Sequence, residues 1–335
     1  MELVRDRHVK FFNRCLKILP SSFEELFDRK PLVAFFCLSG LEILDQVPEE
    51  KSSFIDWLYS MQFLDAETDT AGFLGGFSIA DSNITEPHIF DVPVLGMTYT
   101  SLCSLLILGD DLSRVHRKQI LNDIKRLQLE DGSFYSQFLD GETDLRLVYC
   151  AVSICYILDD FSTIDVDACV RFIKSCLTYE GAVACLPGAE AHGGSSFCAV
   201  ASLALLGRLE EIRDNRADLV RWCLNRQESG FNGRPNKRVD TCYSFWVGGT
   251  LRILDSFQFA DGAMIRDFVC QAQSVITGGF GKWSDASPDP MHSYLALAGL
   301  SFIGKDKLQE LFVPLNVTVR THERLKKIHD AWETA

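Results

Sequence analysis

The sequence predicts an all-α protein in which about six helical hairpins close into an α/α toroid around a central apolar cavity. Two observations support this fold class, a repeat of 49 residues and an alternation between two kinds of helix. The repeat is marked by four glycines, each of which opens a polar loop followed by an apolar segment: Gly132, Gly181, Gly230 and Gly279. Spacing this regular is typical of repeat architectures, and each unit has room for two helices.

The two kinds of helix differ in how their apolar residues are distributed. Segments that follow the glycine loops are apolar almost all round, as expected of helices buried on both sides: 148–158, 196–206, 242–254 and 293–303. Segments between them, such as 116–128 and 218–227, are amphipathic and indicate an outer layer. A toroid places all glycine loops at one rim. An open α-solenoid, which would keep them apart, is the structural alternative.

Composition limits the functional classes. The chain has 335 residues, 47% of them hydrophobic, and no linker divides it, so we expect a single domain over residues 1–335 with a large core. A net charge of −13 argues against a nucleic-acid surface. Most of the twelve cysteines lie in apolar segments without paired spacing, which favours reduced thiols and a cytoplasmic location. We expect neither a targeting peptide nor a transmembrane segment, because no stretch approaches the ~20 apolar residues that a span needs.

The stretch from Arg234 to Trp246 has the most unusual composition, because it combines cations, a carboxylate, a thiol, a phenol and an indole. Asp240 is a suitable helix N-cap, so a helix should begin just after it, with Cys242 in its first turns. His292 enters the equivalent apolar segment of the next repeat. The toroid would therefore bring these three side chains together. From the residues alone, Cys242 is equally well a small core residue, and His292 a helix cap.

Several motifs together resemble a known family. RPNK followed by VDTCYSFWVGGTL, the segment EAHGGSSFCAVASLALLG, and PDPMHSYLALAGLSFIG are similar to sequences of protein prenyltransferase β subunits. The resemblance extends over nearly the whole chain, from RDRHVKFF to HERLKKIHDAW. Within the family, the chain looks most like the type I geranylgeranyltransferases. Farnesyltransferase and the Rab-directed type II enzyme are the alternatives.

The resemblance implies the catalytic β subunit of a zinc enzyme. Such an enzyme transfers a geranylgeranyl group from geranylgeranyl diphosphate to a cysteine in CaaX-terminated proteins such as small GTPases, where X is mostly Leu. It works as a heterodimer with a prenyltransferase α subunit. By position, Asp240, Cys242 and His292 are the ligands of one Zn²⁺ per heterodimer, and the fourth position stays open for the substrate thiolate.

The resemblance also implies a diphosphate site and a lipid site. Residues that match the diphosphate contacts of the family are His192, Gly193, Gly194, Arg234, Lys237 and Tyr243. Residues that match the wall of the lipid cavity are Arg146, Tyr149 and Trp246, and Phe35 and Phe36 are expected at its far end. Leu32 stands near a position where farnesyltransferase has a tryptophan that shortens the cavity, so Leu32 leaves room for a C20 chain.

Two further positions affect chemistry and specificity. Lys282 stands where farnesyltransferase has an aspartate associated with magnesium, so the resemblance implies a catalytic lysine and no Mg²⁺ requirement. Val94 and Gly96 stand where the family has a histidine and an alanine in the pocket for the last peptide residue. This departure puts a strict preference for terminal leucine in question.

Two functions from other classes are possible. A non-catalytic helical-repeat scaffold would use its apolar groove to hold a partner helix and would bind no metal. A terpene cyclase would share the toroid but would need a DxDD or DDxxD cluster, and neither motif is present. Asp110-Asp111 and Asp159-Asp160 lack the third acid and are better explained as helix boundaries.

Overall fold

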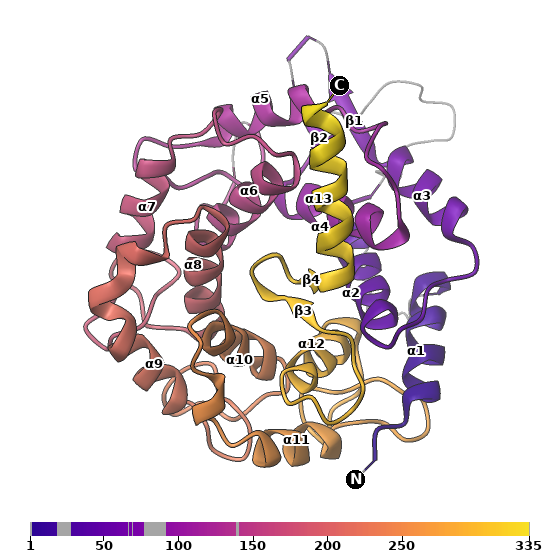
Figure 1. Ribbon diagram of the computed structural model, residues 1–335, viewed down its shortest axis with the longest axis vertical. Helices are drawn as coiled ribbons and strands as arrows, with labels where there is room; N and C mark the ends of the chain where they lie inside the picture. The colour runs from indigo at the N-terminus through magenta and orange to yellow at the C-terminus, as the bar shows by residue number, and fades with distance from the viewer. Residues whose placement is uncertain are drawn as a thin grey trace.

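The computed structural model describes residues 2–18, 28–65, 67–68, 70–76, 92–138 and 141–334, and helices dominate these ranges. An inner ring consists of α2 (Lys30–Ile43), α4 (Leu95–Leu108), α6 (Leu145–Ile157), α8 (Gly193–Leu205), α10 (Tyr243–Ile253) and α12 (Pro290–Ser301). An outer ring consists of α1 (Arg5–Lys17), α3 (Lys51–Ser60), α5 (Arg117–Leu127), α7 (Val166–Ser175), α9 (Arg216–Leu224) and α11 (Gly262–Gln271) (Figure 1). Each inner helix packs against the next, and α12 contacts α2. This contact closes the ring, so the predicted toroid is confirmed and the open solenoid is wrong.

Burial separates the two rings as the sequence pattern predicted. In α4, every residue from Met97 to Leu108 is buried, because the helix has the cavity on one side and outer helices on the other. In α5, the buried residues form one stripe, which begins at Ile120 and ends at Leu127. Burying a large aliphatic side chain contributes about 1.5–3 kcal/mol, so the inner ring supplies most of the hydrophobic stabilisation.

The repeated glycines lie in the loops between an outer helix and the next inner helix. Gly132, Gly181 and Gly279 adopt φ angles of 93°, 88° and 81°, which favour glycine over any residue with a Cβ. At Gly230 glycine is needed for another reason, since a Cβ there would overlap the ring of Phe268. Each loop is closed by an isolated antiparallel bridge: Gln128 with Phe134, Leu177 with Val183, Gln227 with Phe231, and Gln273 with Phe280.

Hydrogen bonds join neighbouring repeats along this rim. A backbone N–H at or just before the start of an inner helix donates to a carbonyl in the loop of the next repeat. The pairs are Leu95 with Ser136 (2.9 Å), Leu145 with Cys185 (3.0 Å), Gly193 with Gly233 (2.8 Å) and Thr241 with Lys282 (3.2 Å). These bonds satisfy donors that a helix N-terminus leaves free, and they fix the loops relative to one another.

The C-terminal segment crosses the opposite end of the ring. It comprises β3 (Leu311–Phe312), the 3-10 turn η4 (Val313–Leu315), β4 (Val317–Thr318) and α13 (Val319–Glu333) (Figure 1). The Gln309 N–H donates to the carbonyl of Ile43 at the end of α2 (2.9 Å), and the Arg324 guanidinium donates to the carbonyl of Leu106 near the end of α4. The β3–β4 hairpin enters the ring from the end where the inner helices stop.

The sequence did not predict the short β-structure. Strands β1 (Gln62–Asp65) and β2 (Thr70–Phe73) form an antiparallel hairpin after α3, with Gln62 opposite Phe73. Two further 3-10 turns, η2 (Leu209–Asn215) and η3 (Phe257–Phe259), precede α9 and α11. The twelve cysteines are all free, as the analysis of their spacing predicted. Among the described residues, the helices are too short or too polar for any of them to traverse a lipid bilayer.

The loop glycines allow a direct test of close backbone approach. We expect Gly132→Ala to destabilise the protein more than Gly188→Ala, although both residues have positive φ (93° and 80°). A Cβ at Gly188 meets no neighbouring atom within 4 Å, whereas a Cβ at Gly132 would overlap the backbone of Ala168. Strain alone costs about 1–2 kcal/mol, and overlap adds about 1–3 kcal/mol. Urea denaturation of both variants measures the difference, and equal midpoints would contradict this account of the loop.

Candidate functional site

The rim where α10 and α12 begin carries Asp240, Cys242 and His292. Asp240 lies on the incoming loop, as predicted, and its Oδ1 accepts a hydrogen bond from the Cys242 N–H (3.0 Å). Helix α10 begins at Tyr243, so the N-cap residue is Cys242 and not Asp240, and the prediction that Cys242 lies in the first turn is wrong. Helix α12 begins at Pro290, which places His292 in its first turn.

These three side chains form a group that could hold a metal ion. One ligand atom from each residue lies within 4.8 Å of the others, and the residues are 4%, 6% and 9% exposed. His292 Nε2 lies 3.4 Å from Asp240 Oδ1. Two nitrogen or oxygen ligands of a tetrahedral zinc are about 3.3 Å apart, given bond lengths of about 2.0–2.2 Å. The separation of the Asp240 and His292 atoms therefore suits a zinc-sized ion.

Electrostatics within the group keeps two of its three members protonated when no metal ion is bound. Burial, followed by the Asp240 charge, raises the pKa of the Cys242 thiol well above its usual value. Burial alone would lower the pKa of His292, but Asp240 and Asp289 outweigh it and raise this pKa to about 9. The free site thus retains protons, and a metal ion would displace them as it binds.

Asp289 supports His292, and sequence analysis did not identify this role. Its Oδ1 accepts the backbone N–H of His292 (2.9 Å), and its Oδ2 lies 2.5 Å from His292 Nδ1. A carboxylate on Nδ1 fixes the imidazole so that Nε2 points toward Asp240 and Cys242. The only signal in the sequence is an aspartate three residues before the histidine. An ordinary N-cap aspartate gives the same pattern, so the sequence does not distinguish the two roles.

Lys282 lies at the edge of the same group. Its Nζ is 3.5 Å from Asp240 Oδ2, and its side chain is 46% exposed. Three hydrogen bonds hold this loop against the residues that flank Asp240. Two join Thr241 to the backbone of Lys282 (3.2 Å) and Gly281 (2.9 Å), and one runs from Trp283 Nε1 to the Val239 carbonyl (2.6 Å). The structure therefore brings Lys282 to the predicted metal ligands.

His192 and Tyr243 form a second polar pair on the rim. Nδ1 of His192 accepts the Gly194 N–H (3.1 Å), and Nε2 lies 2.9 Å from the Tyr243 hydroxyl oxygen. Burial and the Arg234 charge lower the pKa of His192, so the ring is neutral. With Nδ1 as acceptor, Nε2 carries the proton and donates to Tyr243. The Tyr243 O–H is then left to donate to a ligand.

Gly193 and Gly194 begin α8 beside this pair. A Cβ on Gly193 would come within 2.8 Å of the Val247 side chain, so the backbone there packs closely against α10. The same glycine donates its N–H to the Gly233 carbonyl in the neighbouring loop.

The loop after Gly233 carries the two predicted cations. Arg234 is 42% exposed and forms an ion pair with Glu190 (2.7 Å). Lys237 is exposed on the same loop, and its backbone N–H donates to the Arg234 carbonyl (3.3 Å). The Arg234 charge thus acts on both His192 and Tyr243, and Lys237 is exposed on the same loop.

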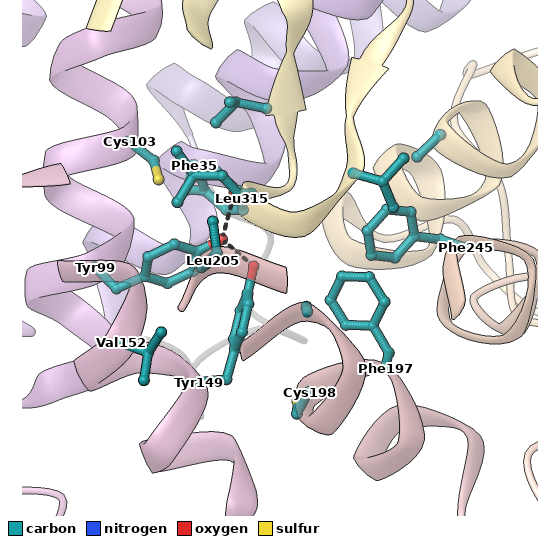
Figure 2. Packing of buried hydrophobic residues seen from close by; sticks show 14 of the residues in the cluster. Phe35, Tyr99, Cys103, Tyr149, Val152, Phe197, Cys198, Leu205, Phe245 and Leu315 are labelled. Atoms are coloured by element: carbon teal, nitrogen blue, oxygen red, sulfur yellow. Dashed lines mark hydrogen bonds between the residues drawn. The ribbon is translucent and has the colours of Figure 1, made fainter. Parts of the chain in front are cut away.

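A cavity of about 430 Å³ lies inside the ring. Arg146, Tyr149 and Trp246 line it, as predicted. The other predicted neighbours that line it are Leu32, Phe35, Phe36, Val94 and Gly96. Figure 2 shows Phe35, Tyr99, Tyr149 and Phe197 around the centre of the ring. Arg146 is held by Glu142 (2.8 Å) and Asp144 (2.9 Å), at the polar side of this lining.

The predicted residues therefore fall into three groups, two on the rim and one around the cavity. The group of Asp240, Cys242, His292 and Lys282 and the group of His192, Tyr243 and Arg234 lie on the rim. Neither contributes to the cavity lining among the described residues. Trp246 connects the groups, because it lines the cavity one helical turn beyond Cys242 on α10.

Comparison with known proteins identifies the family. The profile of the prenyltransferase alpha-alpha toroid domain matches residues 3–332. The chain belongs to this family. Two prenyltransferase relatives are named geranylgeranyl transferase type-1 subunit beta. The chain is 37% identical to that of Dictyostelium discoideum, with 94% of this chain and 95% of the relative covered. It is 34% identical to that of Arabidopsis thaliana, with 92% and 87% covered.

A solved prenyltransferase structure agrees. The chain superimposes on Candida albicans protein geranylgeranyltransferase-I complexed with GGPP with a TM-score of 0.87 and 29% identity. The match covers 98% of this chain and 99% of that chain. The sequence-based prediction of a catalytic type I prenyltransferase β subunit is thereby confirmed, and the scaffold and terpene cyclase alternatives are wrong.

The support that Asp289 gives to His292 can be tested in this prenyltransferase. We expect Asp289→Asn to weaken Zn²⁺ binding by about 10–100-fold, because the imidazole loses the carboxylate that fixes its tautomer and orientation. Asp285→Asn is the matched control, since Asp285 lies in the same loop but pairs with Arg238 (3.3 Å). Competition with a coloured chelator measures the affinity of both variants. Equal affinity for the two variants would show that Asp289 only caps α12.

Proposed function

We propose that the chain binds one Zn²⁺ through Asp240, Cys242 and His292 and transfers a geranylgeranyl group to the cysteine of a CaaX-terminated protein. The observation that carries this proposal is the buried group of carboxylate, thiol and imidazole, whose ligand atoms lie within 4.8 Å of one another. Trp246, one helical turn after Cys242, lines the apolar cavity. Zn²⁺, when bound, would lower the pKa of the substrate thiol so that it reacts as a thiolate.

The reaction forms one bond and breaks one bond. The cysteine sulfur bonds to C1 of the lipid, and the bond from C1 to the bridging oxygen breaks, so diphosphate leaves with the electron pair. Negative charge therefore grows on the diphosphate in the transition state. Fixed donors that face this charge lower the barrier.

The rim residues supply these donors. Tyr243 donates its free O–H to a diphosphate oxygen, and His192 positions Tyr243 through the 2.9 Å hydrogen bond. Arg234 exchanges its partner Glu190 for the diphosphate, which it contacts with a planar fork of N–H groups. Lys237 and Lys282 add positive charge, and the backbone of Gly193 and Gly194 allows close approach.

The cavity selects the lipid. Leu32, Tyr149 and Trp246 form an apolar wall. Because position 32 carries no bulky residue, the cavity has room for a C20 chain and is not restricted to a C15 chain. Arg146 lies where the lining becomes polar. Val94 and Gly96 leave the wall wider than a histidine and an alanine would, so the terminal Leu of the peptide is preferred less strictly.

The remaining assignments follow the same proposal. The active protein is a heterodimer in which this chain, acting as one domain over residues 1–335, pairs with a prenyltransferase α subunit. Its substrates are CaaX-terminated proteins such as small GTPases, and it works in the cytoplasm.

Transfer and metal binding test the proposal together. The purified complex with an α subunit should convert a peptide ending in Cys-aliphatic-aliphatic-Leu to the geranylgeranyl thioether, and should prefer the C20 over the C15 donor in competition.

Cys242→Ala should abolish Zn²⁺ and peptide binding but leave binding of geranylgeranyl diphosphate intact, because the lipid contacts other residues. Cys270→Ala, in a buried site on α11, is the control and should retain Zn²⁺. Full Zn²⁺ occupancy in Cys242→Ala would contradict the ligand assignment, and preference for the C15 donor would contradict the specificity.

The role of Lys282 predicts independence from magnesium. Single-turnover transfer should not respond to millimolar Mg²⁺, because the lysine ammonium already supplies positive charge near the leaving group. Lys282→Asp should create a response to Mg²⁺, since a carboxylate can bind the ion. Lys282→Ala should be slow at every Mg²⁺ concentration. A strong rise of the wild-type rate with Mg²⁺ is the outcome that rejects this role.

A further inference from the structure

Helices α1 and α2 lie side by side and run antiparallel (Figure 1). At one end of the pair, the Arg5 guanidinium donates to the carbonyl of Leu44, just after α2 (3.0 Å). Near the middle, a Cβ on Gly40 would overlap the ring of Phe12. The absence of a side chain at Gly40 therefore lets the two helices approach closely.

This register places two thiols opposite each other. Cys15 lies three residues after Phe12 on α1, and Cys37 lies three residues before Gly40 on α2. Each thiol is thus one helical turn from the close contact, on the same side of it. The two side chains form a hydrogen bond. Cys15 is 5% exposed and Cys37 is fully buried.

A cavity of about 380 Å³ gives access to one member of this pair. Among the described residues that line the cavity, Cys15 is the only thiol, and its neighbours include Ala34 of α2 and Phe54 of α3. Lys17 and Glu50 also line the cavity and form an ion pair (3.5 Å), with side chains that are 60% and 59% exposed. The cavity therefore opens to solvent between α1 and α3, and a small molecule can reach Cys15.

The hydrogen bond makes the two thiols chemically unequal. The bond from Cys37 lowers the pKa of the Cys15 thiol, and the Arg14 charge acts in the same direction. Burial and the Asp289 charge oppose this shift without reversing it. Burial, followed by the bond to Cys15, raises the pKa of Cys37 well above its usual value. Cys37 thus keeps its proton and donates it to Cys15, which makes Cys15 the more reactive sulfur.

We propose that Cys15 and Cys37 form a redox-active dithiol, which a hydroperoxide that enters the cavity converts to a disulfide between α1 and α2. The inference does not rest on the proposed function, because neither cysteine belongs to the proposed metal ligands or to the lining of the lipid cavity. Cys15 is the residue that the oxidant attacks, and Cys37 resolves the product.

The reaction has two steps. In the first, the Cys15 thiolate bonds to one peroxide oxygen and the O–O bond breaks, which gives a sulfenic acid on Cys15. The departing oxygen takes the Cys37 proton and leaves as water or an alcohol. In the second, the Cys37 sulfur bonds to the Cys15 sulfur, and hydroxide leaves and takes up the proton that Cys15 had released. The two sulfurs lose two electrons in total, and the peroxide gains them.

A second pair of cysteines provides a matched control. Cys155 on the inner helix α6 and Cys169 on the outer helix α7 are close enough to interact electrostatically. Both are fully buried, and burial raises the pKa of both thiols, that of Cys169 to about 12. Neither is a thiolate at neutral pH, so this pair should stay reduced under conditions that oxidise Cys15.

Peroxide treatment of the Zn²⁺-loaded complex with an α subunit tests the inference. After exposure to hydrogen peroxide, free thiols are alkylated and the folded complex, verified by circular dichroism, is digested without reduction. Mass spectrometry should find the peptide of Cys15 linked to that of Cys37 with the loss of two hydrogen atoms, and dithiothreitol should separate them. A link between Cys155 and Cys169 should form at least about tenfold more slowly.

Two variants test the order of the steps. Cys37→Ser keeps a hydrogen-bond donor but cannot resolve the sulfenic acid, so dimedone should label Cys15. Cys15→Ser should leave Cys37 unlabelled, and labelling of Cys37 there would contradict the assigned roles. The wild-type complex decides the matter if either variant fails to fold. Absence of the link between Cys15 and Cys37 would overturn the inference. An equally fast link between Cys155 and Cys169 would also overturn it, because oxidation would then follow unfolding.

Discussion

The six inner helices are parallel to one another, and this arrangement determines what each end of the toroid can bind. Their N-termini meet at the rim that carries the glycine loops, and their C-termini meet at the end covered by the C-terminal segment. Helix dipoles add up over such a ring, so the rim attracts anions and the opposite end attracts cations. Three arginines contact carbonyls just after inner helices: Arg5 with Leu44 (3.0 Å), Arg117 with Leu158 (2.6 Å) and Arg216 with Leu254 (2.6 Å).

The parallel helices also explain why ionisable groups can be buried at the rim. Asp240 is 4% exposed, and burial would raise its pKa, but His292 and the Cys242 N–H outweigh this and lower it. The carboxylate is therefore charged beside a thiol and an imidazole. In the free site the protonated imidazole of His292 balances this charge, and a metal ion that displaces the protons of His292 and Cys242 would take its place. In the proposed reaction, the neighbouring Tyr243, positioned by His192, donates to the diphosphate, so the diphosphate contacts residues other than the proposed metal ligands.

The sequence predicted the ring and the convergence of Asp240, Cys242 and His292 because both depend on regular features, whereas the resemblance to the family implied their role as metal ligands. The 49-residue spacing indicated equivalent loops, and equivalent loops placed Cys242 and His292 at one rim. Asp289 was missed because its pattern is also that of an N-cap. The C-terminal hairpin was missed because four strand residues and one 3-10 turn have no periodicity that a sequence can reveal. Cys15 and Cys37 look like ordinary core cysteines until the register of α1 against α2 places them opposite each other.

The central claim is that the triad leaves one metal position for the substrate sulfur. Cobalt can replace zinc in the complex with an α subunit, and its near-ultraviolet absorption reports the number of bound thiolates. With Cys242 as the only thiolate of the protein, addition of a CaaX peptide together with a non-reactive analogue of geranylgeranyl diphosphate should about double this absorption. A peptide with serine in place of cysteine should cause no increase. An unchanged spectrum on addition of the cysteine peptide would contradict the claim that the metal binds the substrate thiolate.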